Sequence, residues 1–179
     1  MRIMRPVRNP LPVSFPVVGG DPALRAELKA MADRDTQVGG PTDERHCARL
    51  WEILDDYECW PGRRLVDDDG ESAAWIIAQR APFDPGLQHR CLEMLEVSVA
   101  CGDAQPAHYA LLLDRVRMAD GKDQLYGSQF VRSDDGNSVV PWPIEDVEHV
   151  DARRERVGLT PLAEQAREMR EQYHRRVAH

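Results

Sequence analysis

Basic residues are in the minority in this sequence, and lysine is almost absent. The chain has 23 Lys and Arg residues against 31 Asp and Glu residues, which gives a formal net charge of −8 at pH 7. Only Lys29 and Lys122 are lysines, and we interpret the preference for arginine as the codon bias of a GC-rich genome. Binding to nucleic acid and to anionic membranes requires a positive field. The composition therefore predicts a protein with no nucleic-acid partner and no membrane partner.

Paired cysteines and long apolar runs are also missing. The four cysteines are Cys47, Cys59, Cys91 and Cys101, and they form no C-x-x-C motif and no dense secreted-type framework. Residues 1–20 contain four prolines, which interrupt any apolar stretch that would serve as a signal peptide or membrane span. We expect reduced thiols, a cytoplasmic location, and an extended N-terminal arm over residues 1–20.

Familiar signatures of catalysis and cofactor binding are absent from the sequence as well. It contains no G-x-S-x-G elbow, no P-loop and no dinucleotide fingerprint. His46-Cys47 and His89-x-Cys91 lack the spacing of zinc ligands on one helix face. The acidic run 67–69 fails the calcium-loop pattern, because its glycine would place Leu65 at the first ligand position. We therefore expect neither a metal nor a cofactor.

Helical periodicity dominates the rest of the chain. Apolar residues recur at three- and four-residue spacing, and Asp-Pro, Thr-Pro or Gln-Pro pairs mark several helix starts. The pattern predicts helices at 22–36, 42–59, 70–81, 85–101, 106–119 and 147–157, and a last one from 161 into the basic C-terminal end. The predicted fold is mainly α: a single-domain bundle over residues 21–179, with about six or seven helices and one small β-hairpin.

The hairpin signal lies between residues 124 and 140. The run QLYGSQFVR is followed by the polar turn SDDGN and by Ser138-Val139-Val140, a pattern that predicts two antiparallel strands. Pro141 and Pro143 end the second strand, because proline cannot continue a hydrogen-bond ladder.

The centre of the predicted bundle is residues 70–81, GESAAWIIAQRA. This helix is apolar on nearly every side, so it belongs inside the domain. The acidic run before it complements the positive helix N-terminus. At its other end stand Gln79 and Arg80, two polar side chains that need partners.

Several short motifs follow one another in a specific order. They are Trp60-Pro61-Gly62-Arg63, Ala73-Ala74-Trp75 with Gln79, Gln88, Asp114-Arg115-Val116, Gln124 with Tyr126-Gly127-Ser128-Gln129, Pro143-Ile144-Glu145-Asp146, and Val150-Asp151-x-Arg153-Arg154. The set resembles a bacterial family of domains of unknown function, over roughly residues 25–165. The resemblance implies a shared fold and a shared pocket, and no established chemistry. In relatives a histidine commonly follows the glutamine of the central helix, whereas this chain has Arg80, so any acid–base or metal-ligating role of that histidine is lost here.

Polar residues that interrupt the apolar helices form the candidate site. His108, Leu112 and Arg115 stand at i, i+4 and i+7, so the imidazole and the guanidinium share one helical stripe, with Asp114 beside them. If the hairpin folds over the helices, further polar side chains converge there, namely Gln79, Arg80, Gln124, Tyr126 and Gln129.

The residue types at this site suggest an anion-holding pocket. Arg80 and Arg115 would bind a carboxylate or a phosphate, and His108 or Asp114 would act as acid or base. The side chains expected to orient the ligand are Gln79, Gln124, Tyr126 and Gln129. The first hypothesis is therefore a small enzyme or ligand-binding protein that takes an anionic small molecule.

Two alternatives stay open. Asp114 and Arg115 are equally typical of a structural ion-pair network, and Arg80 is favourable at a helix C-terminus for dipole reasons alone. The second class of function is a non-catalytic interaction module that binds a protein, or a second copy through the N-terminal arm, with Trp60, Trp142 and the C-terminal helix as contact surface. The first hypothesis requires a concave site lined by the polar residues, whereas the second expects them to pair with one another.

Overall fold

Seven α-helices and one two-stranded antiparallel sheet make up residues 20–177, the part of the chain that the computed structural model describes. The prediction of a mainly α, single-domain bundle with one small hairpin is confirmed. The predicted N-terminal arm, apart from Gly20, lies outside the described residues. None of the helices in the described part has the length and hydrophobicity needed to cross a bilayer.

The elements follow in this order: α1 Pro22–Val38, α2 Glu44–Tyr57, α3 Arg63–Gln79, α4 Pro85–Ala100, α5 Pro106–Ala119, β1 Phe130–Arg132, β2 Val139–Pro141, the 3-10 helix η1 Val147–His149, α6 Val150–Arg156 and α7 Leu162–Val177.

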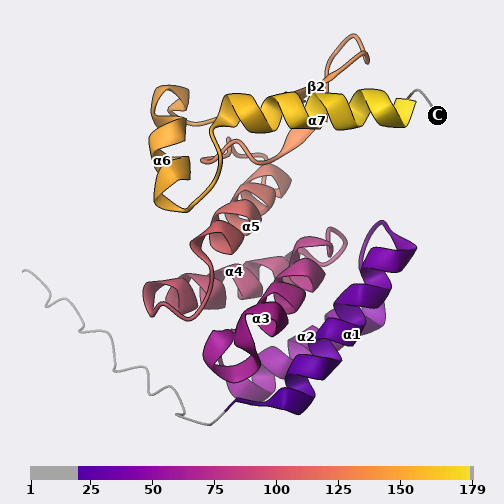
Figure 1. Cartoon of the computed structure of the whole chain (residues 1–179), viewed down its shortest axis with the longest axis vertical. Coiled ribbons are helices and arrows are strands. Elements are labelled where there is room, and N and C mark those ends of the chain that lie inside the picture. Colours follow the sequence, from indigo (N-terminus) through magenta and orange to yellow (C-terminus); the bar gives the residue numbers. More distant parts are fainter. Residues whose placement is uncertain (1–19, 178–179) are drawn as a thin grey trace, which may run out of the picture.

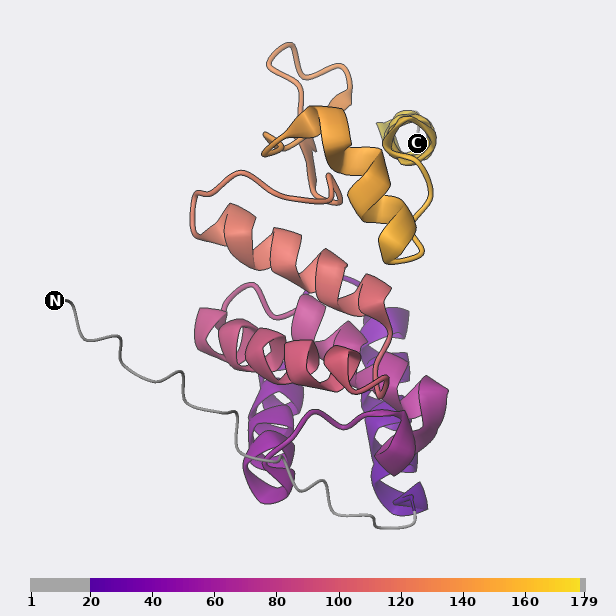
Figure 2. The same cartoon turned by 90° about the vertical axis from the view of Figure 1, so that its left-hand side faces the viewer.

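The helices form a lower and an upper part, with α5 between them (Figure 1). Helices α1 to α4 make the lower part, in which α1 packs most closely on α3, and α4 packs on α5. The hairpin, α6 and α7 lie on the other side of α5, as the view in Figure 2 also shows. The main apolar core runs from Leu24 on α1 to Val116 on α5. In the described upper part only Val150 and Ala166 are buried apolar residues, so polar contacts add to the packing of half-buried apolar side chains there.

Aspartate caps two helices where the sequence predicts them. Asp21 Oδ1 accepts the backbone N–H groups of Ala23 and Leu24 at 3.1 and 2.9 Å. Asp84 Oδ1 accepts the N–H of Leu87 at 2.9 Å. Each of these helices begins with a proline. Proline suits the first position because it has no N–H group that would need a hydrogen-bond partner there.

Helix α3 starts earlier than predicted. The segment expected to be a loop forms a first turn from Arg63, and the helix then kinks at Val66 and Asp67, where Asp67 has φ +57°. Gly70 permits this kink, because a Cβ at that position would lie 2.7 Å from Val66 Cβ. The acidic run 67–69 also forms ion pairs with basic side chains of α1. Arg25 Nε lies 2.7 Å from Asp69 Oδ1, and Lys29 Nζ pairs with the same carboxylate.

The hairpin is shorter than predicted. Its register pairs Phe130 with Pro141, Val131 with Val140 and Arg132 with Val139. Residues 125–129 belong to no strand, and Gln124 makes only an isolated parallel bridge. Gly127 has φ +68°, and side chains accept the segment's N–H groups, as described below, whereas the Gln129 carbonyl accepts the backbone N–H of Trp142 at 2.9 Å.

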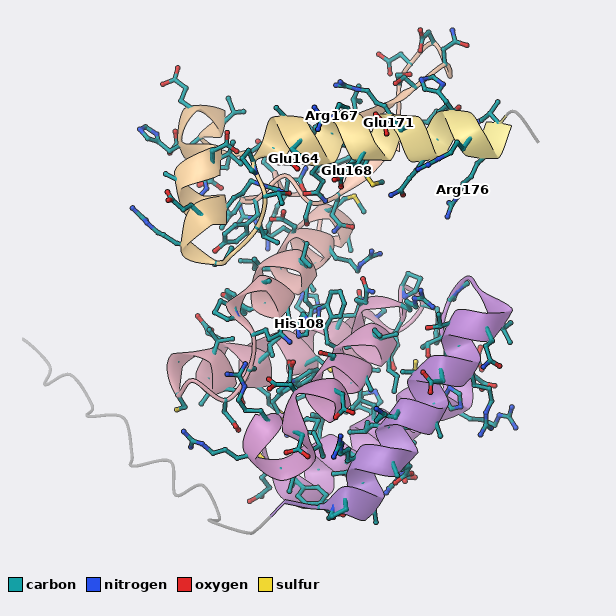
Figure 3. All side chains as sticks on the ribbon, in the orientation of Figure 1. His108, Glu164, Arg167, Glu168, Glu171 and Arg176 are labelled. Atoms are coloured by element: carbon teal, nitrogen blue, oxygen red, sulfur yellow. The ribbon has the colours of Figure 1, made fainter. Side chains whose placement is uncertain are left out.

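Helix α7 covers the hairpin with one apolar stripe, on which Ala166 is buried and Leu162, Met169 and Tyr173 are half-buried. The Tyr173 hydroxyl donates to the Gly136 carbonyl at 2.6 Å. Charged side chains stand off the rest of α7; Figure 3 labels Glu164, Arg167, Glu168, Glu171 and Arg176.

Candidate functional site

A carboxylate and a histidine are paired inside the protein, between α3 and α5. Glu71 is 0% exposed. His108 Nδ1 lies 2.8 Å from Glu71 Oε2 and 3.0 Å from Oε1, and Trp60 Nε1 donates to Oε1 at 3.2 Å. With the carboxylate as acceptor, Nδ1 is the protonated nitrogen of the imidazole. Sequence reasoning found His108 and missed Glu71, which looked like a residue in the first turn of the central helix.

The ring of His108 is held in one orientation. It stacks on Trp75 with ring centroids 4.3 Å apart and planes 7° from parallel, and Trp75 Nε1 donates to the His108 carbonyl at 3.1 Å. Figure 3 shows His108 on the side of α5 that faces the lower helices. The side chain is 10% exposed, and Nε2 has no hydrogen bond to any residue from 20 to 177. Nε2 is therefore the atom that can exchange a proton with a ligand.

Asp114 lies on the side of α5 that faces away from His108, and it binds the chain segment that follows α5. Its carboxylate is 0% exposed and accepts three backbone N–H groups: Leu125 at 2.7 Å, Tyr126 at 3.0 and 3.1 Å, and Ser128 at 3.0 Å. Buried backbone donors need such acceptors when no strand or helix supplies them. Asp114 therefore holds an irregular buried segment in place, and its predicted acid–base role stays a prediction.

Gln124 closes the same segment. Its Oε1 accepts the N–H of Gln129 at 2.8 Å, and its Nε2 donates to the carbonyls of Gln129 at 3.0 Å and Trp142 at 2.7 Å. These are the bonds that a neighbouring strand would otherwise make. Because both ends of the amide are used, Gln124 supports the segment from inside.

Two arginines of α6 hold the carbonyl side of this segment, and sequence reasoning assigned them no role. Arg153 donates to the carbonyls of Leu125, at 2.8 Å, and of Glu145 and Asp146. Arg154 is buried and donates to the Tyr126 carbonyl at 2.6 Å, and also to the Thr160 carbonyl and to Gln165. Burial lowers the pKa of Arg154. The sequence feature that could have identified these two residues is the Arg-Arg pair at the end of the motif set, which lies in a segment with few apolar residues.

Arg115 differs from these arginines. It is half-buried, and burial lowers its pKa. It has no hydrogen bond and no ion pair with a described residue, whereas the other buried or half-buried arginines of residues 20–177 each have at least one. The guanidinium of Arg115 is thus the polar group of α5 with unused donors.

The remaining predicted site residues fall into two groups. Arg80 reaches toward the end of α1, where its Nη1 donates to the Asp35 carbonyl at 3.4 Å and to Thr36 Oγ1 at 3.5 Å. The side-chain amide of Gln79 and the hydroxyl of Tyr126 have no hydrogen bond within the described residues, and Gln129 binds only Ser128 Oγ through its Nε2. Burial, with Asp114 as a smaller cause, raises the pKa of Tyr126.

One known family model matches nearly all of the described chain. Residues 23–178 match the family of unknown function DUF6624. The chain belongs to DUF6624. No curated protein and no solved structure matches it. The resemblance predicted from the motifs is therefore confirmed at the level of the family, and both sides of α5 lie within the DUF6624 region.

The DUF6624 domain contains a second buried carboxylate–histidine pair. Asp35 at the end of α1 accepts His46 Nδ1 at 2.8 Å, the N–H of Asp43 at 3.3 Å and the hydroxyl of Thr42. Thr42 N–H in turn donates to the Arg80 carbonyl at 2.8 Å, so this cluster joins α1, α2 and α3. No spacing rule could have found the pair, because its two members lie on different helices.

The metal, cysteine and tryptophan features considered from the sequence lie as follows in this chain. No group of three or more His, Cys, Asp or Glu side chains suited to a metal ion occurs among residues 20–177. Burial raises the pKa of Cys47 to about 12 and also raises that of Cys91, which makes both thiols poor nucleophiles. Trp60 is buried, and Trp142 donates its indole N–H to the Lys122 carbonyl at 3.0 Å. Both indole N–H groups thus have partners within the protein, and Trp142 as a contact surface stays a prediction.

Proposed function

We propose that this DUF6624 protein binds a small anionic ligand, a carboxylate or a phosphate, at Arg115. The observation that carries the proposal is the half-buried guanidinium without a partner among residues 20–177. Buried charges in proteins are normally paired, because removing them from water costs free energy. A guanidinium presents a planar set of donors that fits carboxylate and phosphate oxygens. An anion at this position would offset the cost that lowers the pKa of Arg115.

Three polar side chains of segments that pack on α5 are further candidates to orient the ligand. Tyr126 and Gln129 belong to the segment that Asp114, the residue directly before Arg115, holds against α5. Gln79 ends α3, which packs against α5. Each of the three keeps at least one polar atom without a partner in the described chain, so each can orient a ligand as the sequence predicts.

His108 would act at a distance from the anion. It lies seven residues before Arg115, which corresponds to about 10 Å along a helix axis. A ligand that reaches both residues must span this length, with its anionic group at Arg115 and a group that exchanges a proton at His108 Nε2. We propose binding as the basic function and proton transfer by the Glu71–His108 pair as its catalytic extension.

A cytoplasmic location also stays part of the proposal. All four cysteines are free thiols, and free thiols are typical of reducing compartments.

The proposal is tested by thermal unfolding in the presence of phosphate, acetate and citrate, each at an ionic strength matched with chloride. Phosphate and citrate stabilise many proteins without a site, so the comparison between variants carries the result. At a ligand concentration one hundred times Kd, binding adds about 2.7 kcal/mol. For a chain of this size we expect an increase in Tm of about 5 to 11 °C.

Arg115→Gln should abolish this increase for the ligand that binds. Arg156→Gln is the matched control, because Arg156 is exposed and also has no partner among the described residues. An increase in Tm that persists in Arg115→Gln, or that is equally lost in Arg156→Gln, contradicts the proposal.

A further inference from the structure

A groove of about 270 Å³ lies between the end of α2 and the side of α4, and it shares no residue with the proposed anion site. It is lined by residues 58–60 and by four side chains of α4, Glu93, Met94, Val97 and Ser98. This volume is just below the range of pockets that hold drug-sized ligands, so it suits a single ring with a short chain.

The floor of the groove combines an aromatic ring with an unused hydroxyl. Trp60 is 1% exposed, with its indole N–H bonded to Glu71, and it closes the floor of the groove, while the half-buried Met94 and the exposed Val97 supply most of the accessible apolar surface. Ser98 is 1% exposed, and its hydroxyl has no hydrogen bond to a residue between 20 and 177. This hydroxyl can therefore donate to or accept from a polar group of a ligand in the groove.

The rim of the groove is negatively charged. Glu58 and Glu93 are both exposed, and neither forms an ion pair or hydrogen bond with the described part of the chain. Other glutamates do have such partners, as Glu27 does in its pair with Arg49. The net charge of −8 adds a field of the same sign. The groove is therefore complementary to a molecule with an apolar body and a positive end.

We propose that this groove binds a small aromatic amine whose ring carries a hydroxyl or N–H group. The ring packs against Trp60, Met94 and Val97, and its polar group bonds to the Ser98 hydroxyl. The ammonium group then lies at the rim between Glu58 and Glu93. Nothing in this arrangement requires an anion at Arg115, so the two proposals can fail separately.

The first test measures affinity by calorimetry with tyramine as the probe. The controls are its neutral alcohol analogue and its carboxylate analogue, 4-hydroxyphenylacetate, and we expect affinity to decrease in that order. Glu58→Gln and Glu93→Gln should each weaken tyramine about 1.5- to 5-fold, as exposed ion pairs do. Glu44→Gln, which changes the same charge on α2 outside this groove, should leave the affinity unchanged. Equal affinity for tyramine and the alcohol, or no effect of either rim variant, overturns the proposal.

The second test locates the ligand. Ser98→Ala should remove the advantage of tyramine over phenethylamine, which lacks the ring hydroxyl. Cys59 lines the groove and is half-buried, so bound tyramine should slow its alkylation by iodoacetamide, while the similarly half-buried Cys101 outside the groove keeps its rate. All rates are compared at one pH, because burial raises the pKa of Cys59. An unchanged rate at Cys59 under saturating tyramine overturns the assignment to this groove.

Discussion

Replacing Asp114 with asparagine should destabilise the part of the protein above α5. The carboxylate makes four contacts with three backbone N–H groups, two from each oxygen. An asparagine that keeps Oδ1 in place retains the bonds to Leu125 and Tyr126. Its NH₂ group then faces the N–H of Ser128, where two donors meet.

The magnitude follows from these contacts. The lost bond to Ser128 is charge-assisted and contributes about 1.5–3 kcal/mol. The two retained bonds become neutral, and neutral bonds have roughly half the strength of charged ones. Together we expect a loss of about 3–6 kcal/mol, which is a large fraction of the roughly 5–15 kcal/mol that stabilises a typical domain.

Urea denaturation followed by far-UV circular dichroism measures the free energy of unfolding. Amide hydrogen exchange locates the effect, and we expect faster exchange at Leu125, Tyr126 and Ser128. Asp123→Asn is the control, since Asp123 is exposed and the charge change is identical; such a surface change usually stays within about 0.5 kcal/mol. If Asp114→Asn unfolds like wild type and protects the same amides, the structural role is refuted and an acid–base role for this carboxylate becomes the better explanation.

Three further predictions concern single side chains. Arg115→Met, measured by urea denaturation without added anion, should raise the free energy of unfolding by about 0.5–1 kcal/mol, because an unpaired half-buried charge is removed; a loss of stability would show that the guanidinium has a partner. His108→Ala should cost about 3–5 kcal/mol in the same assay, because Glu71 stays buried without its counterpart; a cost below about 1 kcal/mol would contradict the pairing. Arg25, then Lys29, lower the pKa of Asp69, so this carboxylate stabilises the fold above its unfolded value of about 3.9 and loses that contribution as the pH falls through the lower folded value. Asp69→Asn should therefore flatten the decrease in urea midpoint between about pH 4 and pH 2, and an unchanged slope would contradict this.

Sequence reasoning was accurate where helix ends are set locally. Helix α5 has the predicted bounds, Pro106–Ala119, and α4 begins at the predicted Pro85. Proline at the first position fixes the backbone angle and needs no partner, so a few neighbouring residues decide where the helix starts. The same holds for Asp21 and Asp84, whose side chains cap helices within three residues.

Sequence reasoning was wrong where residues distant in the chain decide the structure. Residues 124–129 have the alternation of a strand, but Asp114 accepts three of their N–H groups, and Arg153 and Arg154 donate to the carbonyls of Leu125 and Tyr126. The start of α3 was misplaced for a similar reason, since its acidic run pairs with Arg25 across 44 residues of sequence. Local patterns contain no information about such partners.

The same limit applies to the candidate site of DUF6624. A polar side chain in an apolar helix predicts that a partner exists, and it does not predict whether that partner is backbone, another side chain or a ligand. His108, Asp114 and Gln124 were predicted as site residues from the sequence, and all three have protein partners. Arg115 was identified by the same reasoning and has none among residues 20–177.

The contrast between Asp114 and Arg115 explains how an unpaired charge can persist on α5. Neighbouring residues of an α-helix point about 100° apart, so the carboxylate of Asp114 does not face the guanidinium of Arg115. Here three backbone N–H groups occupy both oxygens of Asp114, and they fix its carboxylate on the side of the 124–128 segment. Arg115 is then left with its charge and its donors. If this is correct, Asp114→Asn should weaken anion binding only as far as it disorders this segment, whereas Arg115→Gln should remove it in a protein that stays folded.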